Sequence, residues 1–390
     1  MRVLHVIPAV ASRYGGPSRA IFEMCRALQQ HGTEVLLATT DADGPAHMDV
    51  TKEKAIDYQG VSTIFFSRQW SQRFGYSQGL ARWLDQEVNR FAVVHIHAVF
   101  SHPCIAAARS CQKLKVPYIV RPLGSLDPWS MRQNALVKKT MWQLAVKRML
   151  HSAAAIHYTA DEERQLAESS LGLNNGVVIP LGITMPEVQK KDSPELFLQR
   201  HPNLGKSPYV LTLSRLHPKK NIELLLEVFL NLVKRQKAFD WRLVIAGDGD
   251  ARYVDSLKRL VQQKDSDGRV LFSGWLDGAE RASALRSAAL LALPSHQENF
   301  GLAAAEALAC GVPVVVSEHV NLAPEIKKYG AGWVTSLDTE KFSSTLMEAL
   351  QDKAECNRRG GAGRELVLQR FSWDEVAARL LGLYETVKSR

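Results

Sequence analysis

The chain has 390 residues, a formal net charge of +9, 46% hydrophobic residues and 23% charged residues. At about 100–200 residues per domain, this length predicts two or three domains, whose cores are large enough to fold without a metal or disulfide staple. The composition excludes collagen-like, coiled-coil and wholly disordered classes. No uncharged apolar run reaches about 18 residues, so we expect no transmembrane helix.

The five cysteines and the positive charge indicate the surroundings of the protein. Cys25, Cys104, Cys111, Cys310 and Cys356 are scattered and form no C-x-x-C pair. This pattern favours a reducing compartment over a structural zinc site, so we expect a cytoplasmic protein. The charge predicts an anionic partner, and a phosphorylated substrate, a membrane surface and nucleic acid all remain open on charge alone.

The first half of the chain alternates apolar runs with helical stretches. Pro17–Gln30 has helical spacing, with Ile21, Met24, Cys25 and Leu28 on one side. Continuous apolar strands separated by helices indicate a parallel sheet that is buried on both faces. The predicted strands are Val3–Val10, Glu34–Thr40, Val93–Phe100, Tyr118–Pro122, Ala154–Thr159 and Val177–Pro180.

The alternation lapses and then restarts in the second half. Residues 186–208 hold four prolines and several charges, which predicts a linker. The strands predicted beyond it are Tyr209–Ser214, Arg242–Ala246, Val270–Ser273, Leu290–Pro294 and Val312–Ser317, with helices over Ile222–Gln236, Arg252–Gln263, Ala279–Ser287 and Leu302–Cys310. The chain is therefore expected to form two doubly wound α/β units, with ligands binding beyond the carboxyl ends of strands in the cleft that the units face.

Met131–Leu150 carries five basic residues and no acidic one. At about 100° per residue these cations spread around the helical wheel, so the segment is not a clean amphipathic membrane helix. Two interpretations remain open: a solvated or phosphate-facing helix, and contact with a membrane surface.

Three loops carry residues suited to binding an anion or a sugar. Gly15-Gly16-Pro17-Ser18 opens the first helix, where glycines allow close backbone approach and the helix start favours anions. Ser214–Asn221 includes Arg215 and Lys220, whose charges are able to converge on one diphosphate. Glu298 and Glu306 supply carboxylates that accept hydroxyl hydrogen bonds. Taken singly, each loop is equally consistent with an ordinary turn, a solvated basic loop or surface glutamates.

Together, in this order and placement, the loops resemble those of retaining glycosyltransferases of family 4, which have the GT-B fold. The resemblance includes Ala246-Gly247-Asp248-Gly249, Phe272-Ser273-Gly274-Trp275 and the E-N-F-G-L-x3-E signature of residues 298–306. It implies an N-terminal Rossmann-like domain over 1–185, a linker over 186–208 and a C-terminal nucleotide-sugar domain over 209–373. A last helix, over 374–388, is expected to cross back onto the first domain. The sequence of residues 121–129 resembles that of family members that act in exopolysaccharide synthesis, including cyanobacterial ones.

The resemblance also implies a role for each matching residue. Arg215 and Lys220 would neutralise the donor diphosphate as the glycosidic bond breaks, and Glu298 would hold the hexose hydroxyls. Glu306 would accept hydrogen bonds from the ribose. Because basic residues carry the diphosphate charge, no metal or other cofactor is expected. The donor-binding positions implied are Gly15, Gly16, Gly247, Gly274, Trp275, Leu276, Asn299, Phe300, Gly301, Leu302 and Glu306.

One position departs from the family pattern. Many relatives have a histidine that contacts the donor sugar where this chain has Leu123. His97 and Asp127 are candidates to replace it, although a buried histidine with satisfied hydrogen bonds is the commoner role. His95 and His97 lie two apart on one predicted strand and face the same side.

Competing metal and dinucleotide patterns are weak. D-x-D occurs at Asp41/Asp43, Asp248/Asp250 and Asp265/Asp267, a pattern that holds a divalent metal in other glycosyltransferases. Gly247-Asp248-Gly249-Asp250 also resembles the start of a dinucleotide loop, but Arg252 occupies the place of its third glycine.

The favoured function is a retaining, metal-independent transfer of a hexose from UDP-glucose to a polysaccharide or lipid-linked acceptor, in exopolysaccharide or envelope polysaccharide synthesis. Contact with the inner face of the membrane is an open addition, and no nucleic-acid-binding module is recognisable. Leu123 keeps open an inactive scaffold that binds nucleotide sugar as a partner subunit. A GT-B sugar-nucleotide epimerase is the remaining alternative.

Overall fold

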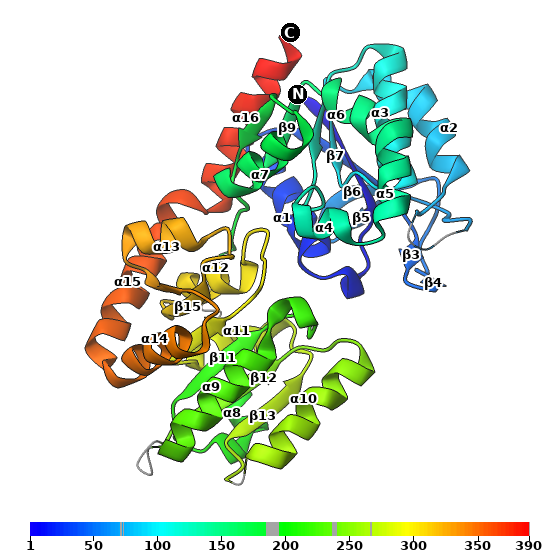
Figure 1. Ribbon diagram of the computed structural model, residues 1–390. Coiled ribbons are helices and arrows are strands. Elements are labelled where there is room, and N and C mark those ends of the chain that lie inside the picture. The colour runs from blue at the N-terminus through cyan, green and yellow to red at the C-terminus, as the bar shows by residue number, and fades with distance from the viewer. Residues whose placement is uncertain (71, 73, 185–194, 236–239, 266, 390) are drawn as a thin grey trace. The chain divides into compact units, whose positions relative to one another are not determined.

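The computed structural model describes residues 1–390 apart from 71, 73, 185–194, 236–239, 266 and 390. It divides the chain into two units (Figure 1). Unit 1 comprises Met1–Gly182 and Trp373–Arg390, and unit 2 comprises Ile183–Ser372. In the described part of the chain, no helix combines the length and apolarity that crossing a membrane requires.

Unit 1 contains an eight-stranded sheet with the order β10-β9-β8-β7-β1-β2-β6-β5. The strands are parallel, except that β5 pairs antiparallel with β6. The strand order reverses at β1, which lies between β7 and β2. The strands are β1 Arg2–Ala9, β2 Glu34–Thr40, β5 Ala55–Tyr58, β6 Val61–Phe66, β7 Val93–His97, β8 Tyr118–Arg121, β9 Ala155–Tyr158 and β10 Gly176–Val178, beside a small hairpin of β3 Ala42–Asp43 and β4 Ala46–His47.

Helices cover both faces of this sheet. Side chains of α2, α3 and α6 pack on one face, and those of α1 and α16 pack on the other. The four predicted inward residues of α1, at i, i+3, i+4 and i+7, are all buried. The helices are α1 Gly16–Gln30, α2 Gln78–Glu87, α3 His102–Leu114, α4 Pro128–Arg132, α5 Ala135–Met141, α6 Lys147–His151, α7 Asp161–Leu171 and α16 Trp373–Lys388, with a π-turn over Trp142–Val146 between α5 and α6.

The last helix, α16, belongs to unit 1 although 190 residues of unit 2 precede it. Tyr384 is fully buried, and its hydroxyl lies 2.8 Å from His95 Nδ1. Trp373 Nε1 donates to Glu23 over 3.2 Å. A Cβ at Gly182 would lie 2.2 Å from the Trp373 ring, so only glycine allows this approach. Buried aromatic area and specific hydrogen bonds thus fix α16 on unit 1.

Unit 2 contains a six-stranded, all-parallel sheet with the order β13-β12-β11-β14-β15-β16. The order reverses between β11 and β14, the arrangement of a Rossmann sheet. The strands are β11 Tyr209–Leu213, β12 Arg242–Ala246, β13 Val270–Gly274, β14 Leu290–Leu293, β15 Val314–Ser317 and β16 Gly332–Thr335. The helices are α8 Leu196–Arg200, α9 Ile222–Arg235, α10 Ala251–Lys264, α11 Gly278–Ser287, α12 Leu302–Ala309, α13 Ala323–Tyr329, α14 Thr339–Gln351 and α15 Lys353–Arg370.

Two doubly wound parallel sheets agree with the predicted fold class. The linker predicted over 186–208 needs correction, although 186–194 lies outside the described residues. Its described part contains α8, where Phe197 is fully buried and its N–H donates to Ser283 Oγ over 2.9 Å. This segment therefore packs as part of unit 2, because the apolar side chain of Phe197 is buried there.

Candidate functional site

The strand order places two loops of unit 2 at one edge of its sheet. Ligands of open α/β sheets bind beyond the carboxyl ends of the strands where the order reverses. In unit 2 those ends are Leu213 of β11 and Leu293 of β14. The loops that follow, 214–221 and 294–301, contain the three residues predicted to be catalytic, Arg215, Lys220 and Glu298. The His296 N–H donates to the Lys219 carbonyl over 2.8 Å, which ties the two loops together.

The loop after β11 is held against the end of β12. The Ser214 N–H donates to the Ala246 carbonyl over 3.1 Å, and the Leu216 N–H donates to the Asp248 carbonyl over 2.9 Å. At Gly247 φ is 137°, and a Cβ there would lie 1.8 Å from the Ser214 carbonyl oxygen. The structure therefore gives Gly247 the role of letting the loop approach β12, which positions the basic residues that follow.

Three cations of this loop surround His217. Burial lowers the pKa of His217, and the charges of Arg215, Lys219 and Lys220 lower it further. Arg215 is exposed, and none of the described residues forms an ion pair with it. The loop is thus a region of concentrated positive charge beside the switch point, as an anion-binding site requires.

Lys220 and Glu298 form an ion pair that the sequence did not predict. Their side chains are 16% and 19% exposed. Glu298 is fixed through its backbone, because its N–H donates to the His319 carbonyl over 3.1 Å and its carbonyl accepts from the Asn321 N–H over 3.1 Å. The predicted phosphate-binding and sugar-binding groups therefore neutralise each other in this structure. A ligand with both a diphosphate and hydroxyls offers each of them a replacement partner.

The helix α12 begins next to this pair. Gly301 caps it with φ of 85°, and a Cβ there would lie 2.8 Å from Val320 Cγ1. Leu302 is the first helical residue. Phe300 is 5% exposed and packs edge-on against Phe371 at 5.5 Å, so its side chain serves the core. Phe300 and its neighbour Asn299 place the helix start, where free N–H groups favour anions.

Glu306, one turn into α12, is 8% exposed and forms an ion pair with Arg281 of α11. The sequence singled out Glu306 but missed Arg281, because nothing in the spacing links the two helices. Ser214 Oγ and Ser295 Oγ, directly after β11 and near the end of β14, are buried and have no hydrogen-bond partner among the described residues. Unsatisfied hydroxyls at a switch point are available to a ligand or to water.

The donor-binding residues predicted at 274–276 lie at the end of β13. Gly274 has φ of 73°, and its carbonyl accepts from the Gly247 N–H over 2.8 Å. Trp275 is 52% exposed, whereas Leu276 is buried. An exposed indole beside the loop of β12 is a surface on which a planar ring is able to stack, with Leu276 anchoring the segment.

The other predicted residues belong to unit 1. Gly15 caps α1 with φ of 77°, and Gly16 is its first residue. A Cβ at Gly15 would meet no atom within 4 Å, so backbone conformation, and not crowding, accounts for glycine there. Leu123 has φ of 56°, which is rare for a branched side chain. Asp127 is buried and caps α4 through the Ser130 N–H at 2.8 Å.

His97 is part of a buried histidine network. His97 Nε2 lies 3.0 Å from His5 Nδ1, His95 Nε2 lies 3.3 Å from His157 Nδ1, and His157 Nε2 donates to the Ile179 carbonyl over 2.8 Å. Burial lowers the pKa of His5 and of His157 to about 3, and it lowers the pKa values of His95 and His97 strongly. The imidazoles are therefore neutral near pH 7. The structure supports the buried-histidine alternative for His97.

Nitrogen atoms of His5, His95 and His97 lie within 4.8 Å of one another, a spacing at which imidazoles are able to share a metal ion. The positive charge of Arg121 lowers the pKa of each of these histidines. The same charge opposes a divalent cation at this place. We therefore regard the cluster as a hydrogen-bonded network.

The D-x-D carboxylates are engaged with the protein itself. Asp41 is buried, pairs with Lys52 at 2.8 Å and accepts from the Arg68 N–H over 2.8 Å. Asp250 caps α10, and Asp265 accepts from the Arg269 N–H over 2.9 Å. These carboxylates thus stabilise turns and helix ends.

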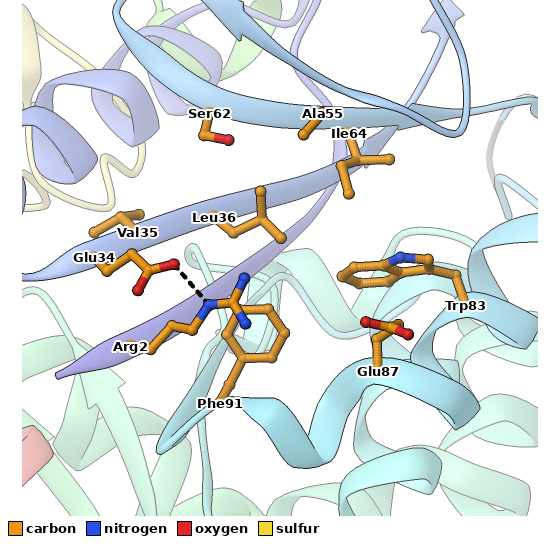
Figure 2. Close-up of a pocket in the computed structure, with 10 residues that line it drawn as sticks. All are labelled: Arg2, Glu34, Val35, Leu36, Ala55, Ser62, Ile64, Trp83, Glu87 and Phe91. Atoms are coloured by element: carbon orange, nitrogen blue, oxygen red, sulfur yellow. Dashed lines mark ion pairs between the residues drawn. The ribbon is translucent and has the colours of Figure 1, made fainter.

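A surface pocket in unit 1 lies at the opposite edge of the sheet from the carboxyl ends. Figure 2 shows Arg2 and Glu34, the first residues of β1 and β2, joined by an ion pair of 2.8 Å beside the Phe91 ring. Because it opens at the amino ends of the strands, this pocket is not where such sheets bind substrates. Its lining comprises Arg2, Glu34, Val35, Leu36, Ala55, Ser62, Ile64, Trp83, Glu87 and Phe91.

Comparison with known proteins identifies the family of each half of the chain. Residues 15–182 match the family described as glycosyl transferase 4-like domain, and residues 195–366 match glycosyl transferases group 1. The chain is 32% identical to D-inositol 3-phosphate glycosyltransferase of Xylanimonas cellulosilytica, over 96% of this chain and 93% of that protein.

Solved structures share the fold over nearly the whole chain. Sucrose-phosphate synthase of Thermosynechococcus elongatus has a TM-score of 0.79 at 20% identity, covering 100% of this chain and 99% of that one. Alr3699/HepE of Anabaena, in complex with UDP and glucose, has a TM-score of 0.77 at 17% identity, covering 99% and 100% of the two chains.

Proposed function

Because the chain belongs to the GT-B glycosyltransferases, we propose that it transfers a hexose from UDP-glucose to a saccharide or lipid-linked saccharide. The observation that carries this proposal is the pairing of Lys220 with Glu298 inside a loop of concentrated positive charge. One group suits a diphosphate and the other suits sugar hydroxyls, and both stand at the switch point of unit 2. The UDP-glucose donor is favoured by the relative that was crystallised with UDP and glucose.

The proposed chemistry needs no metal. Arg215 and Lys220 stabilise the negative charge that develops on the diphosphate as the bond to the sugar breaks. Glu298 exchanges its ion pair for sugar hydroxyls and orients the ring. The leaving phosphate oxygen takes the proton of the acceptor hydroxyl on the same face, so the anomeric configuration is retained. The exposed indole of Trp275 stacks on the uracil ring.

Transfer is tested with purified protein, radiolabelled UDP-glucose and a panel of saccharide acceptors in EDTA. We expect a glycoside product with the anomeric configuration of the donor, by NMR, and loss of product in Glu298→Ala. Product of inverted configuration would contradict the retaining mechanism. Turnover that appears only with Mn²⁺ would contradict metal independence.

A scaffold that binds donor without transferring it is a second candidate, and Leu123 is the observation that favours it. A leucine neither donates a hydrogen bond nor stabilises positive charge. Stabilisation by UDP-glucose with no transfer or hydrolysis across the acceptor panel would decide for the scaffold. Turnover by the purified protein alone decides against it.

We also propose that the enzyme works in the cytoplasm, at the inner face of the membrane, in polysaccharide synthesis. The segment over α5 and the π-turn exposes Leu136 by 84%, Val137 by 60% and Leu144 by 80%. Lys139, Lys147 and Arg148 are exposed beside them, and 128–160 contains no acidic residue. Protruding leucines among cations suit an anionic lipid surface.

Vesicle co-sedimentation tests this surface. The protein is expected to sediment with phosphatidylglycerol vesicles, and Leu136→Ser with Leu144→Ser is expected to abolish most of the binding. Leu166→Ser on α7, which is 44% exposed, is the matched control and is expected to bind normally. Equal loss in the control, or no binding by the unaltered protein, would contradict the proposal.

A further inference from the structure

A buried cation in unit 1 has no part in the proposed chemistry. Arg121 is the last residue of β8, and it pairs in register with His97 at the end of β7. Register partners on neighbouring parallel strands face the same side of the sheet, so the Arg121 side chain lies on the histidine face. It is 4% exposed. Its position is the carboxyl edge of the sheet, where ligands of such folds bind.

No hydrogen bond or ion pair of the Arg121 guanidinium is found within the described part of the chain. Arg121 Nε is buried without an acceptor. The charge of Glu163 raises the pKa of Arg121, but the Glu163 carboxylate is already engaged with other groups. One Glu163 oxygen accepts from the Gly124 N–H over 2.9 Å, and the other accepts from the Thr159 N–H over 2.8 Å and from Thr159 Oγ1 over 2.9 Å.

The surrounding groups do not neutralise Arg121. Burial keeps His5, His95, His97 and His157 neutral, as described above. Burial lowers the pKa of Arg121 itself only to about 10, so the guanidinium stays charged at neutral pH. A buried charge with no counter-ion in contact destabilises a fold, and an anion from outside the chain reduces that penalty.

We propose that Arg121 binds an anion at the carboxyl edge of unit 1, and that this anion is a phosphate group carried by the acceptor. The first part stands on the burial and missing partner of Arg121. The assignment to the acceptor rests on the proposed function, in which cations of unit 2 hold the donor diphosphate. The planar fork of an arginine binds two phosphate oxygens at once, which a lysine does not reproduce.

The test is thermal unfolding of the full chain in sodium phosphate and in sodium chloride of equal ionic strength. Saturating UDP is present throughout, to occupy the cations of unit 2. We expect phosphate to raise the Tm of the unaltered protein by about 4 °C more than chloride does. In Arg121→Gln this increment is lost, while the Tm in chloride stays equal or rises because an uncompensated charge is gone. Arg121→Lys retains less than half of the increment.

Arg68→Gln is the matched control. Arg68 is also buried in unit 1, at 7% exposure, but it donates to the carbonyls of Pro45 and Ala46. Its replacement is expected to lower the Tm in chloride and to leave the phosphate increment intact. The proposal is overturned if the unaltered protein shows no phosphate increment. It is equally overturned if Arg121→Gln keeps the increment and unfolds several degrees lower, which would make Arg121 a structural partner of Glu163.

Two further arms identify the source of the phosphate. Glucose 6-phosphate replaces inorganic phosphate in one, and vesicles of phosphatidic acid replace it in the other. An Arg121-dependent rise in Tm with glucose 6-phosphate alone assigns the site to a soluble phosphate. A rise with phosphatidic acid vesicles alone assigns it to a lipid-borne phosphate. None of these Tm measurements requires the protein to be catalytically active. If UDP causes no stabilisation but the Arg121-dependent increment persists, the proposed function fails and the anion site stands.

Discussion

The two units have the same kind of doubly wound sheet but opposite electrostatics at their carboxyl edges. In unit 2 Arg215 is exposed, and Lys220 and Glu298 are half-buried and form an ion pair that a ligand is able to replace. In unit 1 the comparable positions hold neutral, fully buried histidines and the enclosed Arg121. The difference shows that topology decides where a ligand binds, whereas burial decides which groups stay charged there.

The largest effect is expected where unit 2 loses its exchangeable pair. In the proposed mechanism the charge of Lys220 stabilises the leaving diphosphate, so Lys220→Ala is expected to slow transfer by about 10²–10³-fold in kcat. Lys219→Ala is the control, because it removes a neighbouring charge near His217 and leaves the pair with Glu298 in place. Equal losses of kcat in the two variants would show that the total positive charge of the loop, and not the pair of Lys220 with Glu298, determines the rate.

A smaller effect is expected where unit 2 loses the close approach of two strands. Gly247→Ala places a Cβ 1.8 Å from the Ser214 carbonyl oxygen, in a backbone conformation that side chains avoid. We expect it to lower the free energy of unfolding by about 2–4 kcal/mol in denaturant titrations. Gly274→Ala, which meets no atom within 4 Å, is expected to cost about 1 kcal/mol. If the order were reversed, crowding at Ser214 would not be the cause.

Unit 1 is expected to respond to acid through its histidines. The folded pKa of His157 is about 3, below its ordinary value of 6.5, so the unfolded state binds more protons between these two pH values. The stability is therefore complete above pH 6.5 and declines as the pH falls towards 3, by up to about 1.4 kcal/mol per pH unit for each such histidine.

Calorimetric unfolding at several pH values checks this slope. Between pH 6.5 and 4, His157→Gln is expected to reduce the slope of the free energy of unfolding against pH by the contribution of one histidine. This expectation holds whatever the effect of the substitution on stability at pH 7. Replacement of the exposed His31 is the control for a histidine substitution away from the network. An unchanged slope in His157→Gln would mean that the network titrates in the folded protein.

The smallest effect concerns the cysteine thiols, whose reactivity reports how deeply each side chain is buried in its unit. Burial raises the pKa of Cys104 in unit 1 to about 12 and that of Cys310 in unit 2 to about 11. The Cys310 side chain is partly exposed, whereas Cys25, Cys104, Cys111 and Cys356 are buried. A thiol reagent is therefore expected to label Cys310 first in the native protein, by mass spectrometry. Earlier labelling of Cys104 would contradict the closed interior of unit 1.

Much of the fold was predictable because parallel strands are continuous apolar runs. The predicted strand at Tyr209–Ser214 is observed as Tyr209–Leu213, and the helix at Pro17–Gln30 as Gly16–Gln30. The edge strand β5, its neighbour β6 and the strand β16 were missed. β5 alternates exposed and half-buried residues, so it has no apolar run, and β16 begins with Gly332 and ends with Thr335, so its apolar run is only Trp333 and Val334.

The site was predictable in its loops but not in its pairs. Loops after strands β11 and β14 meet because both strands end at the same edge, which the topology dictates. The partnership of Lys220 with Glu298, and that of Glu306 with Arg281, link residues far apart in sequence, so spacing gave no signal for either. The missing partner of Arg121 was equally invisible, because a lack of contacts is a property of the folded chain.

The central claim is that the charged edge of unit 2 binds a sugar nucleotide, and thermal unfolding in EDTA with UDP-glucose tests it most directly. At about 100 times the dissociation constant, a ligand adds roughly 2.7 kcal/mol of stability. The account predicts a clear rise in Tm for the unaltered protein and a much smaller one for Glu298→Ala. No rise with any nucleoside diphosphate sugar, or an undiminished rise in Glu298→Ala, would contradict it.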